Sequence, residues 1–283
     1  MTRHLDAREQ ERRAAARGAT RRAPALAVAG ATGEALAMLA RRGLHPRLAR
    51  PDLPFPRDLG PENAERVSER LGHYGFRLFL RGAILAGGPF QPEEATRYLG
   101  AAEARRAGED LVALGLATEV VGGRLRLRQP ARSFGGTLEW WVARELARRL
   151  AVDVAWGVRS GAPGVGGDLD VVAAAEGKLA YLELKSGPPK HLMPAEVSSF
   201  FRRLRSLRPH LSIFVLDTAL RLSDKVLPML AGAVDRPGRP ERIRRDVWRI
   251  APGLYAASAR GDLMENVCLA FGDGLAALSP DPP

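Results

Sequence analysis

The residues best suited to chemistry lie on two short segments in the second half of the chain. Asp168 and Asp170 belong to the first segment, and Glu183 and Lys185 belong to the second. Both segments are rich in apolar and β-branched residues, and Gly177 lies in the turn-like stretch between them, so they predict a β-hairpin. Side chains two residues apart leave the same face of a strand. We therefore expect Glu183 and Lys185 on one face, and Asp168 and Asp170 together on a face of the neighbouring strand.

Carboxylates and an ammonium group would thus converge on one spot. Burying such groups together is costly unless a divalent cation neutralises the carboxylates, and hard oxygen ligands suit Mg²⁺ or Mn²⁺. The structural alternative is an ion pair on an edge strand. It is disfavoured because Glu183 and Lys185 lie within an apolar run, whereas Glu176 and Lys178, which have the same spacing, lie in the predicted turn.

A helix is expected just before the first strand. Leu138, Val142 and Leu146 follow helical spacing, and Thr137 is expected to cap the helix, which places Glu139 near its first turn. The same spacing favours a place in the core, rather than a base-stacking role, for the tryptophans of this region: Trp140, Trp141 and Trp156.

This arrangement resembles the PD-(D/E)XK nuclease superfamily. That superfamily places an Asp on one strand, Glu-x-Lys on the next and often a Glu on the preceding helix, and the matching residues here are Asp170, Glu183, Lys185 and Glu139. The sequence is most similar to nuclease domains of CRISPR ancillary effectors and Holliday-junction-resolvase-like proteins in three segments: Gly-Gly-Thr-Leu-Glu, Asp-Leu-Asp-Val-Val and Leu-Glu-Leu-Lys-Ser-Gly. The resemblance covers about residues 134–218. The sequence departs from the family pattern in two ways. No Pro precedes the expected metal-binding Asp, and no upstream segment resembles a domain that senses cyclic oligonucleotides.

The resemblance implies metal-assisted hydrolysis of a phosphodiester. Asp170, Glu183 and the Leu184 carbonyl would hold Mg²⁺ or Mn²⁺, and Glu139 would bind the same ion through water or a second ion. Lys185 would orient or activate the attacking water, or offset the developing negative charge. Asp168 is either an additional ligand or a carboxylate at the turn.

A second resemblance, at the level of pattern only, covers about residues 62–130. A helix or helix pair, a short helix opening at Pro92 and closing at Gly100, and a third helix over about 102–114 precede two β-runs around Gly122 and Gly123. This order resembles a winged helix-turn-helix domain, whose ribbon contacts the DNA backbone. Alternation places three guanidinium groups on one face of the expected wing: Arg124, Arg126 and Arg128. The third helix is less basic, so docking of a protein on this domain is the alternative.

Further basic residues follow the Glu-x-Lys segment. They lie on or beside a helix expected over 194–207 and around a later Pro-rich loop: Lys190, Arg202, Arg203, Arg205 and Arg208, then Arg242, Arg244, Arg245 and Arg249. Such clusters neutralise phosphates without reading sequence. The alternative is a set of solvated helix faces.

Composition agrees with a polyanionic partner. The chain has 283 residues, a formal net charge of +11 and 46% hydrophobic residues, which is enough for a substantial core. Genomic base composition is another source of the many arginines.

The single Cys268 excludes a disulfide framework, a Cys-based zinc site and a four-Cys cluster, and favours a reducing cytoplasm. No apolar run is long enough for a membrane-spanning helix. The glycine-rich stretch 161–167 lacks the Gly-Lys-Ser/Thr of a nucleotide-binding loop, so an ATPase is not supported.

Three regions are expected along the chain. Residues 1–60 form a basic helical segment and a Pro-rich linker, 61–130 a winged-helix-like domain, and 131–283 the nuclease domain. The fold class is α/β, with a restriction-endonuclease-like mixed sheet flanked by helices and an N-terminal helical and winged-helix region. The elements after residue 216 either extend this sheet or form a dimer surface.

The sequence therefore favours a cytoplasmic, Mg²⁺- or Mn²⁺-dependent nuclease that prefers DNA to RNA, in genome defence, repair or recombination. The preference for DNA rests on the winged-helix interpretation. One alternative is a nuclease-fold DNA-binding or scaffold protein without activity. Another is an effector subunit that is inactive alone and is activated by a partner on the winged-helix domain.

Overall fold

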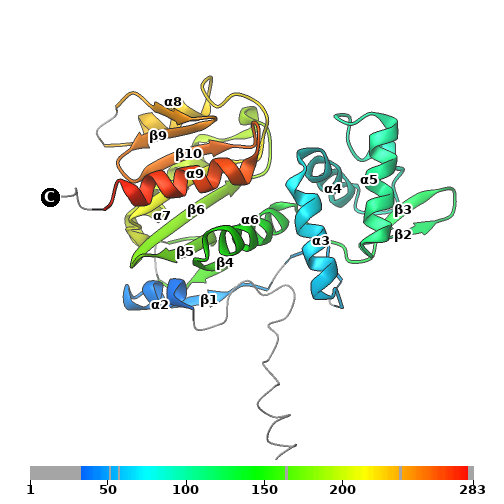
Figure 1. Ribbon diagram of the computed structural model, residues 1–283, viewed down its shortest axis with the longest axis horizontal. Helices are drawn as coiled ribbons and strands as arrows, with labels where there is room; N and C mark the ends of the chain where they lie inside the picture. Colours follow the sequence, from blue (N-terminus) through cyan, green and yellow to red (C-terminus); the bar gives the residue numbers. More distant parts are fainter. Residues whose placement is uncertain (1–32, 51, 57, 163–164, 236–237, 280–283) are drawn as a thin grey trace, which may run out of the picture.

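The computed structural model describes residues 33–50, 52–56, 58–162, 165–235 and 238–279. Over these residues the chain forms a large mixed sheet flanked by helices and a smaller helical region that carries a two-stranded ribbon (Figure 1). The Arg-rich segment before residue 33 lies outside the described residues. No helix among the described residues is long and apolar enough to span a membrane.

The large sheet contains eight strands in the order β1-β4-β5-β6-β7-β10-β9-β8. Strands β6, β7 and β10 run parallel to one another, and the remaining neighbours are antiparallel. The strand bounds, in chain order, are β1 Pro46–Leu48, β4 Asp153–Ser160, β5 Asp168–Ala175, β6 Lys178–Lys185, β7 Leu211–Leu216, β8 Glu241–Arg244, β9 Val247–Ala251 and β10 Leu254–Ser258. The predicted hairpin is confirmed as β5 and β6, and the elements after residue 216 extend the sheet.

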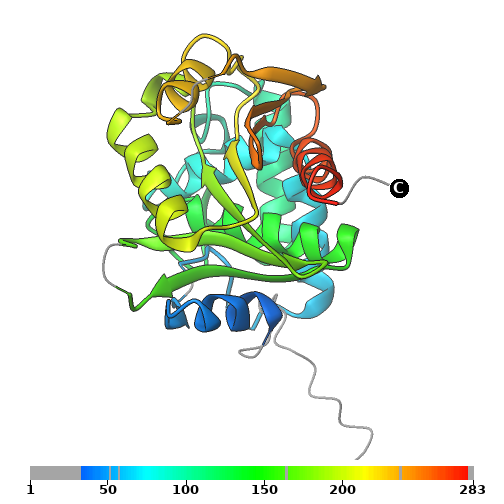
Figure 2. The same ribbon diagram turned by 90° about the vertical axis from the view of Figure 1, so that its left-hand side faces the viewer.

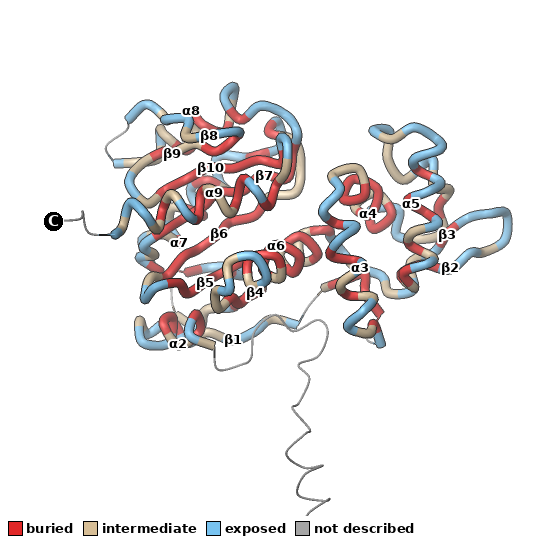
Figure 3. Tube along the Cα trace, viewed as in Figure 1, coloured by how far each residue is buried: buried red, intermediate tan, exposed pale blue. Residues whose placement is uncertain are grey.

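Helices cover both faces of the sheet, and its central strands are buried (Figures 2 and 3). Helices α6 (Gly135–Leu150) and α9 (Leu263–Ala276) share one apolar core with the sheet. Helices α2 (Glu34–Arg41), α7 (Pro194–Leu207) and α8 (Val226–Gly232) share the other. The bounds of α7 agree with the prediction.

The smaller region contains three helices and the ribbon. Their bounds are α3 Pro61–Gly72, α4 Tyr74–Ala86, α5 Ala101–Ala113, β2 Ala117–Val120 and β3 Arg124–Leu127. The helix pair, the third helix and the ribbon were predicted. The segment opening at Pro92 differs, because only the 3₁₀ turn η1 (Pro92–Glu94) forms there before the chain continues without helix to Gly100. Gly122 and Gly123 both have positive φ, which suits the turn of a hairpin.

The segment expected to be a linker contains a sheet strand. β1 pairs antiparallel with β4, and α2 packs against β4 and β5. The Ala35 N–H at the start of α2 donates to Asp153 of β4 at 2.7 Å. The strand has only three residues and begins with Pro46, so it is too short to show an alternating pattern. The many prolines of this segment therefore led to the prediction of a linker.

Thr137 also differs from its expected role. α6 begins at Gly135, so Thr137 lies inside the helix, where it is buried and its Oγ1 has no hydrogen-bond partner among the described residues. Glu139 therefore lies slightly deeper in the helix than expected, in its second turn.

The two regions of the molecule are joined through α6 and α4. A continuous apolar core runs from α3, α4 and α5 along α6 into the sheet. The Arg77 guanidinium of α4 donates through Nε and Nη2 to Asp217, at 3.0 Å to Oδ1 in both cases, and both side chains are only 2% exposed. The Asp217 N–H in turn donates to the Lys185 carbonyl at 2.8 Å. The helical region is thus attached next to the end of β6 that carries the predicted site.

Candidate active site

A cleft of about 340 Å³ opens where β5, β6 and β7 meet the start of α6. Four of the predicted site residues line it: Glu139 on α6, Asp170 on β5, and Leu184 and Lys185 on β6. Residues of the segment that follows β6 also line it: Ser186, Gly187, Pro188, His191 and Leu192. The structure therefore brings together side chains from a helix and two strands, as the spacing predicted.

Asp170 projects where β5 and β6 separate. The pairing of these strands ends at Val171 and Leu182, which leaves the Leu184 N–H free to donate to Asp170 Oδ2 at 2.7 Å. Burial and the nearby charge of Glu183 raise the pKa of Asp170 to about 7, against the opposing effect of this hydrogen bond. Among the described residues, no hydrogen bond is made to Oδ1 of Asp170.

Glu139 reaches the same cleft from α6. Glycines surround its carboxylate: a Cβ at Gly135 would lie 3.8 Å from Oε1, and one at Gly157 would lie 3.7 Å from Oε2. Burial raises the pKa of Glu139 to about 8, with further contributions from the charges of Asp170 and Asp168. Two carboxylates therefore share one cleft without enough positive charge nearby to keep both ionised at neutral pH.

Glu183 is held differently. Its side chain is 1% exposed, and Nη2 of Arg203 donates to both of its oxygens, at 2.6 and 2.7 Å. Lys185 Nζ lies 2.9 Å from Oε1, and the Tyr181 hydroxyl donates to Oε2. Burial alone would raise the pKa of Glu183, but the charges of Lys185 and Arg203 outweigh burial and lower it. Glu183 is therefore an ionised, fully paired carboxylate.

Lys185 is a cation in this setting. Burial favours its neutral form, but the charge of Glu183 and the hydrogen bond to it raise the pKa of Lys185. Glu196 of α7 lies 3.6 Å from its Nζ. A lysine that is held charged is suited to stabilising negative charge and is a poor general base.

The donor set suits a hard divalent cation in part. Glu139 and Asp170 supply oxygen atoms and an excess of negative charge in one cleft, which is the chemistry that Mg²⁺ and Mn²⁺ prefer. Glu183 could contribute only if Arg203 and Lys185 released its oxygens. Within the described part of the chain, no group of three or more His, Cys, Asp or Glu side chains is arranged to hold a metal ion.

Asp168 lies outside the cleft. Its side chain is exposed and accepts from Arg159 Nε of β4 at 2.9 Å. Its charge nevertheless contributes to the raised pKa of Glu139. Of the two aspartates on β5, only Asp170 faces the other predicted residues.

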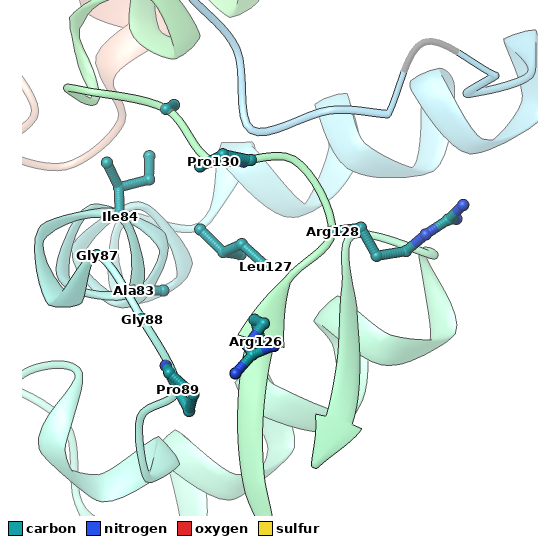
Figure 4. Close-up of a pocket in the computed structure, with 10 residues that line it drawn as sticks. Ala83, Ile84, Gly87, Gly88, Pro89, Arg126, Leu127, Arg128 and Pro130 are labelled. Atoms are coloured by element: carbon teal, nitrogen blue, oxygen red, sulfur yellow. The ribbon is translucent and has the colours of Figure 1, made fainter.

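The wing arginines are exposed, as predicted, but two of them make local bonds. Arg124 donates to the Pro89 carbonyl at 2.6 Å, and Arg128 donates to the Gly115 carbonyl at 3.1 Å. Arg126 and Arg128 both line a pocket of about 440 Å³ between the end of α4 and the ribbon, and the end of the Arg128 side chain points away from Arg126 (Figure 4). Arg126 is therefore the wing arginine with the guanidinium least engaged by the described residues.

The basic residues after Lys185 divide into two kinds. Lys190, Arg202 and Arg205 are exposed, and Lys190 immediately precedes His191, which lines the cleft. Arg203 was expected among these phosphate-binding residues, but it is buried against Glu183. Helical spacing could have identified the burial of Arg203, although not its partner, because Arg203 follows Val197 and Phe200 on the buried face of α7.

The fold is mixed α/β, with a large mixed sheet flanked by helices, and it is similar to solved structures. The chain is similar to the crystal structure of protein VC1899 from Vibrio cholerae, with a TM-score of 0.53 and 17% identity over 87% of this chain and 62% of that one. It thus spans less than two thirds of VC1899. A second solved structure, Can2 from Sulfobacillus thermosulfidooxidans in complex with cyclic tetra-adenylate, gives a TM-score of 0.38 and 17% identity over 53% of this chain and 44% of that one. No family model and no curated protein matches the chain.

Proposed function

We propose that the chain is a metal-dependent nuclease of the PD-(D/E)XK type, and that it hydrolyses phosphodiester bonds with DNA preferred over RNA. The observation that carries this proposal is the convergence of Glu139, Asp170 and Lys185 on one cleft. The raised pKa values of the two carboxylates support it, because they indicate negative charge that a bound cation would compensate.

Each side chain then has a role that its surroundings allow. Asp170 and Glu139 would hold Mg²⁺ or Mn²⁺, which would lower the pKa of a bound water molecule and offset charge on the phosphate. Lys185, held charged by Glu183, would stabilise the negative charge that develops on the phosphate oxygens. Arg203 and Tyr181 would position Glu183, and through it the ammonium group of Lys185.

Substrate binding is assigned to the exposed basic residues. Lys190 flanks the cleft, Arg202 and Arg205 lie on α7, and Arg126 lies on the ribbon. Their charges would neutralise phosphates and make binding salt-dependent. The preference for DNA, a cytoplasmic location and a setting in defence, repair or recombination belong to the same proposal.

A second candidate function is an effector that is inactive alone and is activated by a partner. The paired state of Glu183 favours it, because Arg203 and Lys185 occupy the oxygens that the superfamily uses for the metal. A partner on the helical region could reach this site through Arg77 and Asp217, since Asp217 is hydrogen-bonded to the Lys185 backbone.

A cleavage panel tests both candidates. Linear, circular, single-stranded and branched DNA, and RNA, are incubated with the chain in Mg²⁺ or Mn²⁺, and wild type is compared with Lys185→Ala. We expect cleavage of DNA that Lys185→Ala reduces by about 100-fold or more. Measurable Mn²⁺ binding without cleavage of any substrate would favour the partner-activated effector, and absence of both would favour an inactive scaffold.

A further inference from the structure

The segment Ala95–Leu99, between η1 and α5, lies directly on α4. A Cβ at Gly82 would lie only 1.6 Å from the Ala95 carbonyl oxygen, so this contact requires glycine. Seven residues earlier, on the same side of α4, a Cβ at Gly75 would lie 3.1 Å from Leu99. The first approach brings the backbone of the segment against α4 at Ala95, and the second brings the Leu99 side chain against α4.

Tyr98 lies on this segment and is exposed to solvent. Its side chain is 59% exposed, although Leu99 beside it packs against the core. The Arg97 guanidinium carbon lies 5.1 Å from the centre of the Tyr98 ring, and Nη2 donates to the phenol oxygen at 3.0 Å. The Tyr98 N–H donates to Thr96 Oγ1 at 3.3 Å. An exposed aromatic ring and its guanidinium neighbour are thus held together on a segment that packs against α4.

Two further cations from neighbouring elements, Arg81 and Lys190, act on this pair. The hydrogen bond and charge of Arg97 lower the pKa of Tyr98, and the charges of Lys190 and Arg81 lower it further. Arg81 precedes Gly82 on α4, which Figure 1 shows between the sheet and α5. Lys190 belongs to the turn that contributes His191 to the cleft. Lys225 Nζ donates to the Lys190 carbonyl at 2.8 Å.

We propose that Arg97 and Tyr98, with Arg81 and Lys190, form a site for an unpaired nucleotide of the substrate. A base would stack on the exposed Tyr98 ring, and the guanidinium and ammonium groups would contact the flanking phosphates. This inference rests on the proposed function and extends it, because it specifies the substrate class. A base inside a duplex cannot present its face to a side chain, so the substrate has a single-stranded segment, such as a fork, a flap or a tail.

The test measures binding without chemistry. Full-length chain in EDTA is titrated against a fluorescent single-stranded DNA oligonucleotide and against a blunt duplex of the same sequence, and anisotropy gives the affinities. We expect Tyr98→Ala to weaken single-strand binding by about 5- to 100-fold and duplex binding by less than about twofold. Tyr98→Phe keeps the ring, so its affinity for the single strand should stay within about threefold of wild type.

The matched control is Leu85→Ala, an exposed apolar residue on α4 that is 74% exposed and outside the proposed site. It should leave both affinities unchanged. An equal loss for single strand and duplex in Tyr98→Ala, or no loss for either, would overturn the proposal, as would a wild-type chain that binds no single-stranded DNA. The result is independent of the nuclease proposal, because a chain that binds single strands through Tyr98 but cuts nothing would overturn only the latter.

A second readout locates the base. A single-stranded oligonucleotide that carries 5-iododeoxyuridine is photo-crosslinked to the wild-type chain, and the modified peptide is identified by mass spectrometry. We expect the crosslink on the peptide that contains Tyr98. Crosslinks confined to the ribbon or to α7 would contradict a nucleotide site at the segment 95–99.

Discussion

Glu139 and Asp170 carry more negative charge into one cleft than their surroundings neutralise. Burial raises the pKa of both, to about 8 and about 7, so each takes up a proton as the pH falls through that value. Glu183, two residues from Lys185, shows the opposite behaviour, because Lys185 and Arg203 hold it ionised. Three carboxylates within one site thus have different charge states at neutral pH, set by which of them has a cationic partner.

This charge balance makes the metal-free protein sensitive to pH. The folded-state pKa of Glu139 lies above its unfolded value. The contribution of this carboxyl group to the free energy of unfolding is therefore fully present below the unfolded pKa and is lost as the pH rises through about 8. In EDTA we expect the free energy of unfolding to fall by on the order of 1 kcal/mol or more between about pH 6 and about pH 9. Urea denaturation at several pH values measures this.

Glu139→Gln should flatten that pH dependence, because the amide resembles the protonated acid. Addition of Mg²⁺ at high pH should restore part of the lost stability in wild type through preferential binding to the folded state. An identical pH dependence in wild type and Glu139→Gln would show that Glu139 is not the group responsible.

Arg203 and Arg202 offer a matched pair of substitutions on α7. Arg203→Gln leaves a buried Glu183 without its bidentate partner, so we expect a loss of about 3–5 kcal/mol in the free energy of unfolding. Arg202 is exposed, and Arg202→Gln should change stability by less than about 0.5 kcal/mol. Chemical denaturation measures both, and equal small effects would contradict a structural role for Arg203.

At the scale of elements, the parts with strong periodicity were predictable and those that depend on distant partners were not. Strands β5 and β6 and helix α7 follow apolar spacing, and their predicted positions are confirmed. The strand β1 is too short to show a pattern, and its place is decided by pairing with β4. The Arg203–Glu183 pair joins residues from two elements, so no local spacing specifies that the two side chains meet.

The arginines of the ribbon and of α5 differ in how far they are paired. Arg126 on β3 is exposed, whereas Arg105 on α5 is paired with Glu93 at 2.8 Å. If the ribbon contacts the phosphate backbone, Arg126→Ala should weaken duplex binding at every sequence and reduce the salt slope by about one. Arg105→Ala should have a smaller effect on both. Salt-dependent anisotropy titrations in EDTA distinguish them, and a larger effect at Arg105 would indicate that α5, not the ribbon, meets DNA.

At the scale of the whole molecule, the helical region and the sheet share a core and a buried ion pair. Arg77 stacks over Trp141, with its guanidinium carbon 4.8 Å from the ring centre, and is bonded to Asp217 beside the Lys185 backbone. The sequence predicted separate regions, because the proline-rich stretch placed a boundary near residue 60 and the end of the winged-helix pattern placed another near residue 130. The continuity of the core was not predictable, since it depends on how α6 meets α3 and the sheet together.

We expect the two regions to unfold in one cooperative transition. Arg77→Met removes the partner of a buried Asp217 and should lower the free energy of unfolding by about 3–5 kcal/mol. Calorimetry of wild type and Arg77→Met measures this. Two separate transitions in wild type would contradict a shared core, and an unchanged midpoint in the variant would show that the ion pair contributes no net stability.

The most direct test of the proposed active site compares two aspartates on one strand. Asp170 lines the cleft, whereas Asp168 is exposed and paired with Arg159. Single-turnover cleavage of a forked DNA in Mn²⁺ is measured for wild type, Asp170→Asn and Asp168→Asn. We expect metal-dependent cutting that Asp170→Asn reduces by about 100-fold or more and Asp168→Asn changes by less than about threefold. Cutting by Asp170→Asn at the wild-type rate, or no cutting by wild type, would contradict the proposed active site.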